Sequence, residues 1–593
     1  MFNFLKNNKV LTSINIFYKL AFWMNLGGLL LFILDFGFNQ DSFFQEIINH
    51  SYIAIILSGI IATILRYITH RKQLNIKVFS FDFLSVILST YIIFIHFFEI
   101  PIFFIDINFL QNFKWIKIAV LLTFVRELSA QNVNYKNINL NPAQLFITSF
   151  LGIILSCSFL LMLPNATNQH LEYLDALFTA TSAVCVTGLA VVDTGTHFTL
   201  LGQSIILLFI QLGGLGILTF ASYFSYFFKG GSSYSNQLVL SDMTNSNKIG
   251  EVFSTFKRIL IITFFIETIG AIMIYTSLNK TIIPSFIERV FFSVFHSVSS
   301  FCNAGFSTLS NSLFENDYQF NYYLQLNIIS LFVLGGLGFP IVINLIKYIR
   351  YLISKYITQI YIGQKKHKPW VLNLNSRITL ITTISLSIFG TLCFLVFEYD
   401  NTLANHGFIG KITTSIFQAT TPRTAGFNSV DMSTLYTPTI LITILLMWIG
   451  ASPSSTGGGI KTSTFAIATL NFISLARGKE KIEVYHREIG NTTVRRAFAI
   501  ITLSLIIIGL GVLLISYFNP KIALLSIIFE CFSAYSTTGL SLGITADLSS
   551  ESKFVLIFIM FIGRVSMLSL LIAFMKKVKF KNYRYPSEDI LIN

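Results

Sequence analysis

The sequence predicts an all-α integral membrane protein that has four similar units in one chain, preceded by about four further transmembrane helices. The first observation is composition: of 593 residues, 53% are hydrophobic and 11% are charged, and mean hydropathy is +0.69. A soluble domain typically carries about 25% charged residues. The second is that apolar runs extend from residue 14 to residue 575, which leaves no sizeable soluble domain. The third is a glycine-centred turn that recurs four times.

Charge and cysteine content argue against a nucleic-acid-binding protein and against a metal site built from cysteines. The formal net charge is +14, and the basic clusters at 66–77, 347–368, 477–496 and 576–584 alternate with apolar runs. Short basic loops are typical of the cytoplasmic side of a membrane protein. No cluster carries a nucleic-acid motif, so we expect a lipid bilayer and no nucleic acid as partner. The five cysteines show no metal-ligand spacing and are expected to be small buried apolar residues.

Residues 1–140 form the predicted N-terminal transmembrane extension, with apolar spans near 15–37, 51–66, 80–98 and 113–127. No small-residue cleavage site follows the first span, so we expect it to be retained. The loop "RYITHRKQLNIK" is basic and predicted to be cytoplasmic, whereas "FNQDSFFQEIINHS" lacks Lys and Arg and is predicted to face outward. Four spans return the chain to the inside.

A voltage-sensor interpretation of this extension rests on Lys114, Lys117 and Arg126 in or near its last span. A voltage sensor carries basic residues at every third position of one helix. That spacing is absent here, so we favour a scaffold or a dimer contact.

The next part of the chain contains a fourfold internal repeat. Four segments resemble one another: "SAVCVTGL" (182–189), "SSFCNAGF" (299–306), "TTPRTAGF" (420–427) and "SAYSTTGL" (533–540). Their glycines are Gly188, Gly305, Gly426 and Gly539, so the successive separations are 117, 121 and 113 residues. We expect repeats at 141–230, 250–355, 376–477 and 494–580, and a cytoplasmic tail at 581–593.

Each turn follows an apolar segment of roughly 14–16 residues, which is shorter than the ~20 residues needed to cross a bilayer. Two longer apolar runs flank each segment. These runs lie at about 145–163 and 199–228, 256–278 and 322–351, 378–398 and 437–474, and 497–517 and 552–576. The predicted unit is therefore a span, a re-entrant half-helix, an extended turn and a second span.

The recurrence of this unit predicts one shared ion pathway. Non-helical backbone at membrane depth is tolerated only where it lines a cavity, because its N–H and C=O groups are unpaired. Four turns around a pseudo-fourfold axis would present rings of carbonyl oxygens that replace the hydration shell of a cation. Glycine permits positive φ and close approach of neighbouring backbones. The half-helices would direct their negative C-terminal ends toward the ion.

These turns resemble those of the Trk/Ktr/HKT superfamily of potassium-translocating membrane subunits. Four further segments carry the resemblance: "QLGGLGILTF" (211–220), "VLGGLGFPIVIN" (333–344), "WIGASPSSTGGGIKTSTF" (448–465) and "GRVSMLSL" (563–570). The resemblance covers about residues 140–580. It implies a multi-pass homodimer in a bacterial cytoplasmic (inner) membrane, with K⁺ as the transported ion and no cofactor in this chain. It also implies a cytoplasmic ring of RCK-type regulatory subunits, which bind the nucleotide.

The resemblance assigns the K⁺-binding selectivity filter by position. The filter residues are Val186, Thr187, Gly188, Leu189, Asn303, Ala304, Gly305, Phe306, Thr424, Ala425, Gly426, Phe427, Thr537, Thr538, Gly539 and Leu540. In the family, glycine in all four turns accompanies potassium selectivity, while serine in the first turn accompanies sodium permeation in some plant members. Gly188 therefore favours potassium.

The segment "ASPSSTGGGIKTST" interrupts the second span of the third unit. Relative to Ala, Pro costs a helix about 3 kcal/mol and each Gly about 1 kcal/mol, so the helix is predicted to break there. The resemblance implies an intramembrane gating loop containing Gly457, Gly458 and Gly459, with Lys461 beside them. A phosphate-binding loop is disfavoured because the lysine does not directly follow a glycine and no soluble strand precedes it.

Arg564 lies within the last predicted span, where an intramembrane arginine is functional by default. The resemblance implies a positive charge beneath the filter that contacts the gating loop. Structural pairing or snorkelling of the side chain is the alternative. Ser566-Met567 follow Val565 here and depart from the "GR(L/V)GP" pattern of the Ktr branch, so the branch stays open.

Five acidic residues near the turns are predicted to lie on the outer side: Asp175, Asp193, Asp317, Asp431 and Asp547. They could concentrate cations at the mouth of the pathway or be solvated loop charges.

Together these patterns predict potassium uptake through a four-repeat filter, gated by an intramembrane loop and a cytoplasmic regulatory subunit. A sodium-permeable or sodium/proton-coupled symporter of the same superfamily remains an alternative. An alternating-access transporter of another class would show paired broken helices in two inverted halves. We do not expect an enzyme, because HExxH, GxSxG and an intramembrane Asp pair are absent from the sequence.

Overall fold

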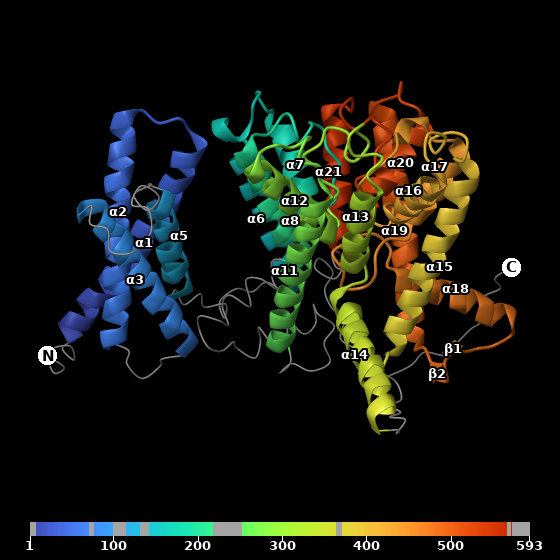
Figure 1. Cartoon of the computed structure of the whole chain (residues 1–593), viewed down its shortest axis with the longest axis horizontal. Coiled ribbons are helices and arrows are strands. Elements are labelled where there is room, and N and C mark those ends of the chain that lie inside the picture. Colours follow the sequence, from blue (N-terminus) through green and yellow to red (C-terminus); the bar gives the residue numbers. More distant parts are fainter. Residues whose placement is uncertain are drawn as a thin grey trace, which may run out of the picture.

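The computed structural model describes residues 8–69, 76–98, 114–130, 142–216, 252–362, 371–565 and 571. Most of these residues are helical, and the predicted all-α class is confirmed. One short antiparallel ribbon joins β1 (Glu483–Val484) to β2 (Arg487–Glu488). Figure 1 shows a smaller N-terminal group of helices beside a larger helical body.

In its described residues the N-terminal group contains four helices, as the sequence predicts. They are α1 (Asn8–Gly37), α2 (Ser42–Thr69), α3 (Ile76–Phe98) and α5 (Lys114–Ala130). The prediction of a loop at residues 38–51 is wrong for most of its length, because α2 already begins at Ser42. Asp41 immediately precedes it, and its carbonyl accepts a bond from Gln45 N (2.9 Å), so a good capping residue starts the helix early.

Ion pairs between helices hold this N-terminal group together. Lys117 of α5 contacts Asp35 of α1 (2.7 Å), and Tyr52 of α2 donates to the same carboxylate (3.0 Å). Nearer the other end, Arg126 pairs with Asp82 of α3, and Arg66 of α2 pairs with Glu127. Charged groups within a membrane are tolerated when paired, and the charged residues Lys117, Arg126 and Glu127 of α5 have their partners on α1, α3 and α2, respectively.

The larger body contains the four repeats, each with an outer helix, a half-helix and an inner helix. Repeat 1 has α6 (Pro142–Leu161), the 3₁₀ turn η2 (Pro164–Ala166), α7 (Tyr173–Cys185) and α8 (Leu200–Leu215). Repeat 2 has α11 (Val252–Ser277), α12 (Phe286–Phe301), α13 (Tyr322–Gly336) and α14 (Phe339–Ile362). Repeat 3 has α15 (Leu374–Phe397), α16 (Phe408–Thr420), η4 (Met432–Thr434), α17 (Thr437–Trp448) and α18 (Thr462–Ala476). Repeat 4 has α19 (Asn491–Phe518), α20 (Leu524–Ser536) and α21 (Ser550–Val565). Parts of the predicted runs 199–228 and 552–576 lie outside the described residues.

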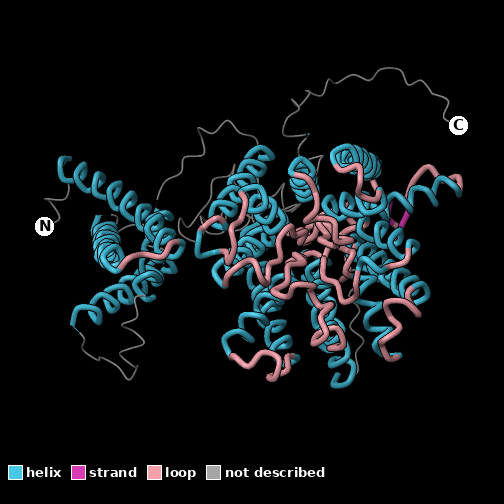
Figure 2. Tube along the Cα trace, turned by 90° about the horizontal axis from the view of Figure 1, so that it is seen from above, coloured by secondary structure: helices cyan, strands magenta, loops and turns pink. Residues whose placement is uncertain are grey.

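The half-helices α7, α12, α16 and α20 have 13, 16, 13 and 13 residues. At 1.5 Å per residue, 13 residues extend about 20 Å, which is less than the ~30 Å hydrocarbon core. Each half-helix therefore ends inside the membrane, and the chain after it must turn back. Seen from above, the loops gather in the middle of the large body, enclosed by helices (Figure 2).

The apolar run 322–351 is not one straight span, as the sequence suggested, but two helices. The chain bends by 108° between α13 and α14. Gly338 has φ +82°, and Pro340 occupies the first turn of α14, where its missing N–H is tolerated. Figure 1 shows α14 extending below the other helices of the body.

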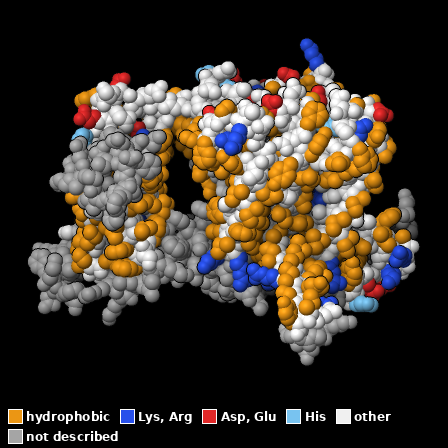
Figure 3. All heavy atoms as spheres, viewed as in Figure 1, with side chains coloured by type: hydrophobic (Ala, Val, Ile, Leu, Met, Phe, Trp, Pro, Cys, Tyr) orange, Lys and Arg blue, Asp and Glu red, His pale blue; other side chains and the backbone are white. Residues whose placement is uncertain are grey.

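The surface agrees with a membrane protein. Among the described residues, five helices are long and apolar enough to cross a membrane, or six spans if the bent pair counts as one. A broad band of hydrophobic side chains covers the body, with Lys and Arg gathered along its lower edge (Figure 3). Such a basic edge is typical of the cytoplasmic side of a membrane protein.

The N-terminal group contacts repeat 1 near the opposite edge. Asn165 Nδ2 donates to the carbonyl oxygen of Phe36 (3.1 Å). Gly37, at the end of α1, lies so close to Leu163 that an added Cβ would meet the leucine side chain at 2.6 Å. The extension is therefore attached to the outer end of α6.

Candidate ion pathway

The structure brings the four glycine turns into one closed ring. In each turn the glycine lies against the carbonyl oxygen of the residue that precedes the glycine of the next repeat. A Cβ added to the glycine would overlap or crowd that oxygen. The pairs are Gly188 with Ala304, Gly305 with Ala425, Gly426 with Thr538, and Gly539 with Thr187. The contacts run from repeat 1 to 2, 3, 4 and back to 1, so the four turns surround one axis.

The backbone of each turn has positive φ at two residues separated by one. The pairs are Val186 (59°) and Gly188 (90°), Asn303 (60°) and Gly305 (70°), Thr424 (76°) and Gly426 (80°), and Thr537 (52°) and Gly539 (89°). Positive φ is uncommon outside glycine, so four non-glycine examples at equivalent positions indicate a conformation that the surroundings enforce.

Hydroxyl groups near the end of each half-helix hold the turn. Ser182 Oγ accepts a hydrogen bond from Gly188 N (3.0 Å), and Ser533 Oγ accepts one from Gly539 N (3.1 Å). In the other two repeats the hydroxyl donates to the residue after the glycine: Ser299 to Phe306 O (2.7 Å) and Thr421 to Phe427 O (2.6 Å). These hydroxyl anchors were not among the residues predicted for the site. A hydroxyl five or six residues before each glycine was the available signal.

The residue after each glycine contributes only its main chain to the ring, because its side chain is buried behind the turn. Leu189, Phe306, Phe427 and Leu540 are at most 2% exposed and belong to the hydrophobic clusters behind the ring. Their side chains anchor the turn outward. The groups of each turn that remain to face the axis are therefore backbone carbonyls.

A cavity of about 380 Å³ lies beyond the ring and is lined by the residues that follow all four turns. Asp193 and Asp431 line it. Asp175 instead pairs with Lys553 (2.7 Å), and Asp317 and Asp547 are not among its lining residues. Two of the five predicted acidic residues are thus placed to attract cations to the mouth.

The interrupted segment of repeat 3 lies against the other side of the ring. Gly458 N donates to Thr537 Oγ1 (2.9 Å), and Thr456 Oγ1 lies 3.1 Å from the side-chain amide of Asn303. A Cβ on Gly457 would overlap Thr424 Oγ1. One loop therefore contacts the turns of repeats 2, 3 and 4.

Two basic side chains fix this loop. Lys461 Nζ donates to Gly457 O (2.6 Å) and lies 3.5 Å from Gly458 O. The Arg564 guanidinium donates to Thr456 O and to Gly213 O at the end of α8. Both side chains are half-buried. Arg564 thereby connects the loop to repeat 1. Among the described residues, no direct hydrogen bond joins the loop to the turn of that repeat.

The break between α13 and α14 also contacts the loop, which the sequence analysis missed. Ser452 N donates to Gly336 O (2.9 Å), and Phe339 N lies 3.3 Å from Ser454 O. A Cβ on Gly338 would meet Pro453 O at 2.5 Å. The signal was present in "VLGGLG", whose last glycine is the one at the bend.

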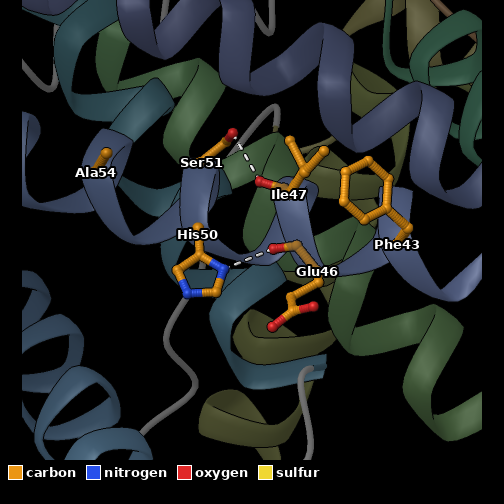
Figure 4. Close-up of a pocket in the computed structure, with 6 residues that line it drawn as sticks. All are labelled: Phe43, Glu46, Ile47, His50, Ser51 and Ala54. Atoms are coloured by element: carbon orange, nitrogen blue, oxygen red, sulfur yellow. Dashed lines mark hydrogen bonds between the residues drawn. The ribbon is translucent and has the colours of Figure 1, made fainter.

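Neither a metal cluster nor the hollow on α2 competes with this pathway. The described residues contain no group of three or more His, Cys, Asp or Glu that could hold a metal. A hollow near the outer end of α2 is lined only by residues 43–54 of that helix (Figure 4). Its hydrogen bonds, His50 to Glu46 O and Ser51 to Ile47 O, are local to the helix, so no polar groups converge there.

Comparison with known proteins agrees with this geometry. The sequence model of the family described as "TrkH: Cation transport protein" matches residues 110–584. The chain is 35% identical over 459 residues to the Ktr system potassium uptake protein B of Bacillus subtilis, covering 77% of this chain and 97% of that protein. It is 35% identical over 463 residues to the potassium/sodium uptake protein NtpJ of Enterococcus hirae, covering 76% and 97%.

A solved structure shows the same fold. The potassium transporter TrkH from Vibrio parahaemolyticus superposes with a TM-score of 0.56 at 15% sequence identity, covering 89% of this chain and 97% of that chain. At this identity the likeness concerns the fold alone. The family match begins at residue 110, so α1, α2 and α3 lie before it.

Proposed function

The chain belongs to the TrkH family of cation transport proteins, and we propose that it takes up potassium through the ring of four glycine turns. The observation that carries the proposal is the closed cycle of glycine–carbonyl contacts among Gly188, Gly305, Gly426 and Gly539. Such a ring presents oxygens from four sides at one narrow point, as a cation stripped of water requires. The family is one of transport proteins and not of enzymes.

Glycine in every turn supports potassium as the cargo. A larger residue at any of the four positions would place a Cβ against a carbonyl oxygen and change the ring that coordinates the ion. The Bacillus subtilis relative at 35% identity is named for potassium uptake.

The loop beneath the ring is proposed as the gate. It contacts three turns through Thr456, Gly457 and Gly458, and Arg564 and Lys461 hold it in place. A loop rich in glycine can move without breaking a helix, and its displacement would open the space beneath the filter. The Arg564 charge would oppose a cation on that path until the loop moves.

The proposal also covers the membrane in which the protein lies, its oligomeric state and its regulatory partner. We place the protein in a bacterial cytoplasmic membrane, as a homodimer with a cytoplasmic RCK-type subunit that binds the regulatory nucleotide. Two relatives named as Ktr system proteins, B and D, support the idea of a system with more than one component. The helix α14, which extends below the body in Figure 1, carries the basic residues Lys347 and Arg350 and offers a cytoplasmic surface for this subunit.

Radiotracer uptake in liposomes tests the function. We expect the purified protein to take up potassium faster than sodium, and Gly305→Ser to reduce that preference. Gly407→Ser is the matched control, because a Cβ at Gly407 meets nothing within 4 Å and serine suits its helix N-cap position. Absence of potassium uptake by the wild-type protein, or an unchanged preference in Gly305→Ser, would contradict the proposal.

Sodium permeation is the second candidate. The relative from Enterococcus hirae, at 35% identity, is named for both potassium and sodium uptake. The same experiment decides: equal uptake of the two ions by the wild-type protein would favour this alternative, and sodium-dependent potassium uptake would favour a coupled symporter.

A further inference from the structure

Three of the four half-helices carry a buried polar side chain that faces the outer end of the turn. His296 of α12, Gln418 of α16 and Glu530 of α20 lie nine, eight and nine residues before the glycine of their repeat. Their exposed fractions are 0%, 3% and 0%. Burial of such groups is unfavourable unless they are hydrogen-bonded, so their partners indicate what they do.

In repeat 2 the partner is Ser307, two residues beyond Gly305. His296 Nδ1 lies 2.9 Å from Phe292 O, which can only accept, so Nδ1 carries the proton. In the neutral ring, Nε2 then accepts a hydrogen bond from Ser307 Oγ (3.0 Å). Ser307 Oγ also accepts from Leu309 N (3.0 Å). The imidazole thus ties the strand that leaves the turn to the half-helix.

Repeats 3 and 4 make the same connection with different chemistry. Gln418 Nε2 donates to Ser429 Oγ (3.2 Å), three residues beyond Gly426. Glu530 Oε1 accepts hydrogen bonds from Ser541 Oγ, two residues beyond Gly539, and from Thr545 Oγ1 (3.0 Å). An imidazole, an amide and a carboxyl group therefore occupy equivalent places.

Repeat 1 lacks the connection. Thr179 lies nine residues before Gly188, but its buried Oγ1 has no hydrogen-bond partner. Ala190, two residues beyond the glycine, has no polar side chain to offer. Gln203 of α8 holds the loop only further out, at Thr194 O (3.2 Å). No hydrogen bond from a side chain of α7 reaches residues 189–192, all of which are described.

We propose that His296, Gln418 and Glu530 are positioning residues for cation discrimination, which fix the outer strand of three of the four filter turns. This rests on the proposed function of the ring as a potassium filter. Carbonyl rings discriminate ions by the number and position of their oxygens, and a hydrogen bond to a packed helix restricts how far a turn can move. Repeat 1 is then the quarter of the ring with the least restrained outer strand.

Site-directed variants assayed by potassium and sodium uptake in liposomes test this inference. Ser307→Ala and Ser541→Ala remove the hydroxyl partner of each hydrogen bond in the outer strand. His296→Ala and Glu530→Ala remove the partner on the half-helix. Loss of one neutral hydrogen bond should lower the potassium-to-sodium uptake ratio about fivefold. His296→Gln should restore it, since glutamine already makes this connection in repeat 3.

Thr179→Ala is the matched control, because it removes a hydroxyl at the equivalent buried position that ties nothing. Its uptake ratio should equal that of the wild type. In a double-mutant cycle, His296→Ala with Ser307→Ala should cost no more than either change alone. Lower melting temperatures with an unchanged uptake ratio, or an equal effect of Thr179→Ala, would overturn the inference. A wild-type protein that takes up no potassium would instead contradict the proposed function.

Discussion

The ring and the loop beneath it differ in how often the chain supplies them. The ring is assembled from four turns of similar sequence, with the same contact repeated from each repeat to the next. The loop occurs once, in repeat 3, and Arg564 occurs once, in repeat 4. Selection of an ion requires oxygens on all sides and is shared among repeats, whereas closing a path requires one movable obstacle. The comparison predicts equal effects of substitutions around the ring and unequal effects beneath it.

The largest effect is expected from Gly426→Ala. The alanine would have φ near +80°, which costs about 1–2 kcal/mol, and its Cβ would overlap the carbonyl oxygen of Thr538. Potassium uptake should fall by more than about tenfold. Gly188→Ala and Gly539→Ala should match it, because their contacts are equivalent. Normal potassium uptake by any one of the three variants would show that its turn does not contribute to the ring in the same way as the others.

A smaller effect of opposite sign is expected from Arg564→Ala. The guanidinium donates to Thr456 O and Gly213 O, and hydrogen bonds to charged groups contribute about 1.5–3 kcal/mol. Without them the loop is less firmly held, so potassium uptake should rise by about tenfold, the factor that corresponds to the lower end of this range. Arg564→Lys keeps the charge but cannot bond both carbonyls in the same way. Wild-type uptake by both variants would remove Arg564 from the gate.

The smallest effect is expected from Thr537→Val, which removes one hydrogen bond between the ring and the loop beneath it. Valine occupies the equivalent position 186 with the same left-handed backbone, so the turn should tolerate it. The change removes only the acceptor of Gly458 N (2.9 Å). Uptake should change by about two- to fivefold, and the potassium-to-sodium ratio should stay the same. A changed ratio would show that the loop takes part in selectivity.

The repeated parts of the molecule could be predicted from the sequence, and the single contacts could not. The four turns were visible because Gly188, Gly305, Gly426 and Gly539 recur at near-constant spacing. The break at "PSSTGGG" was visible because its residues cannot form a stable helix. The carry-over of filter and gate roles to particular residues remains a prediction.

Contacts between distant segments had no such signal. The pairs Lys117–Asp35 and Arg126–Asp82 join residues 82 and 44 positions apart, on helices whose relative rotation the sequence does not specify. The contact of the α13–α14 bend with the loop was missed because one apolar run was taken as one span. The early start of α2 was missed because Gln45, Glu46, Asn49 and His50 interrupt the apolar run that marks a span.

The closed cycle of contacts also has a consequence for how such a chain can evolve. Four copies of one unit in a single polypeptide are free to diverge, and the residues two positions before the glycines, Val186, Asn303, Thr424 and Thr537, have done so. The glycines have not, because the place of each missing side chain is filled by the main chain of the neighbouring copy. We therefore expect the four copies to tolerate substitution more readily at the position two residues before the glycine than at the glycine itself.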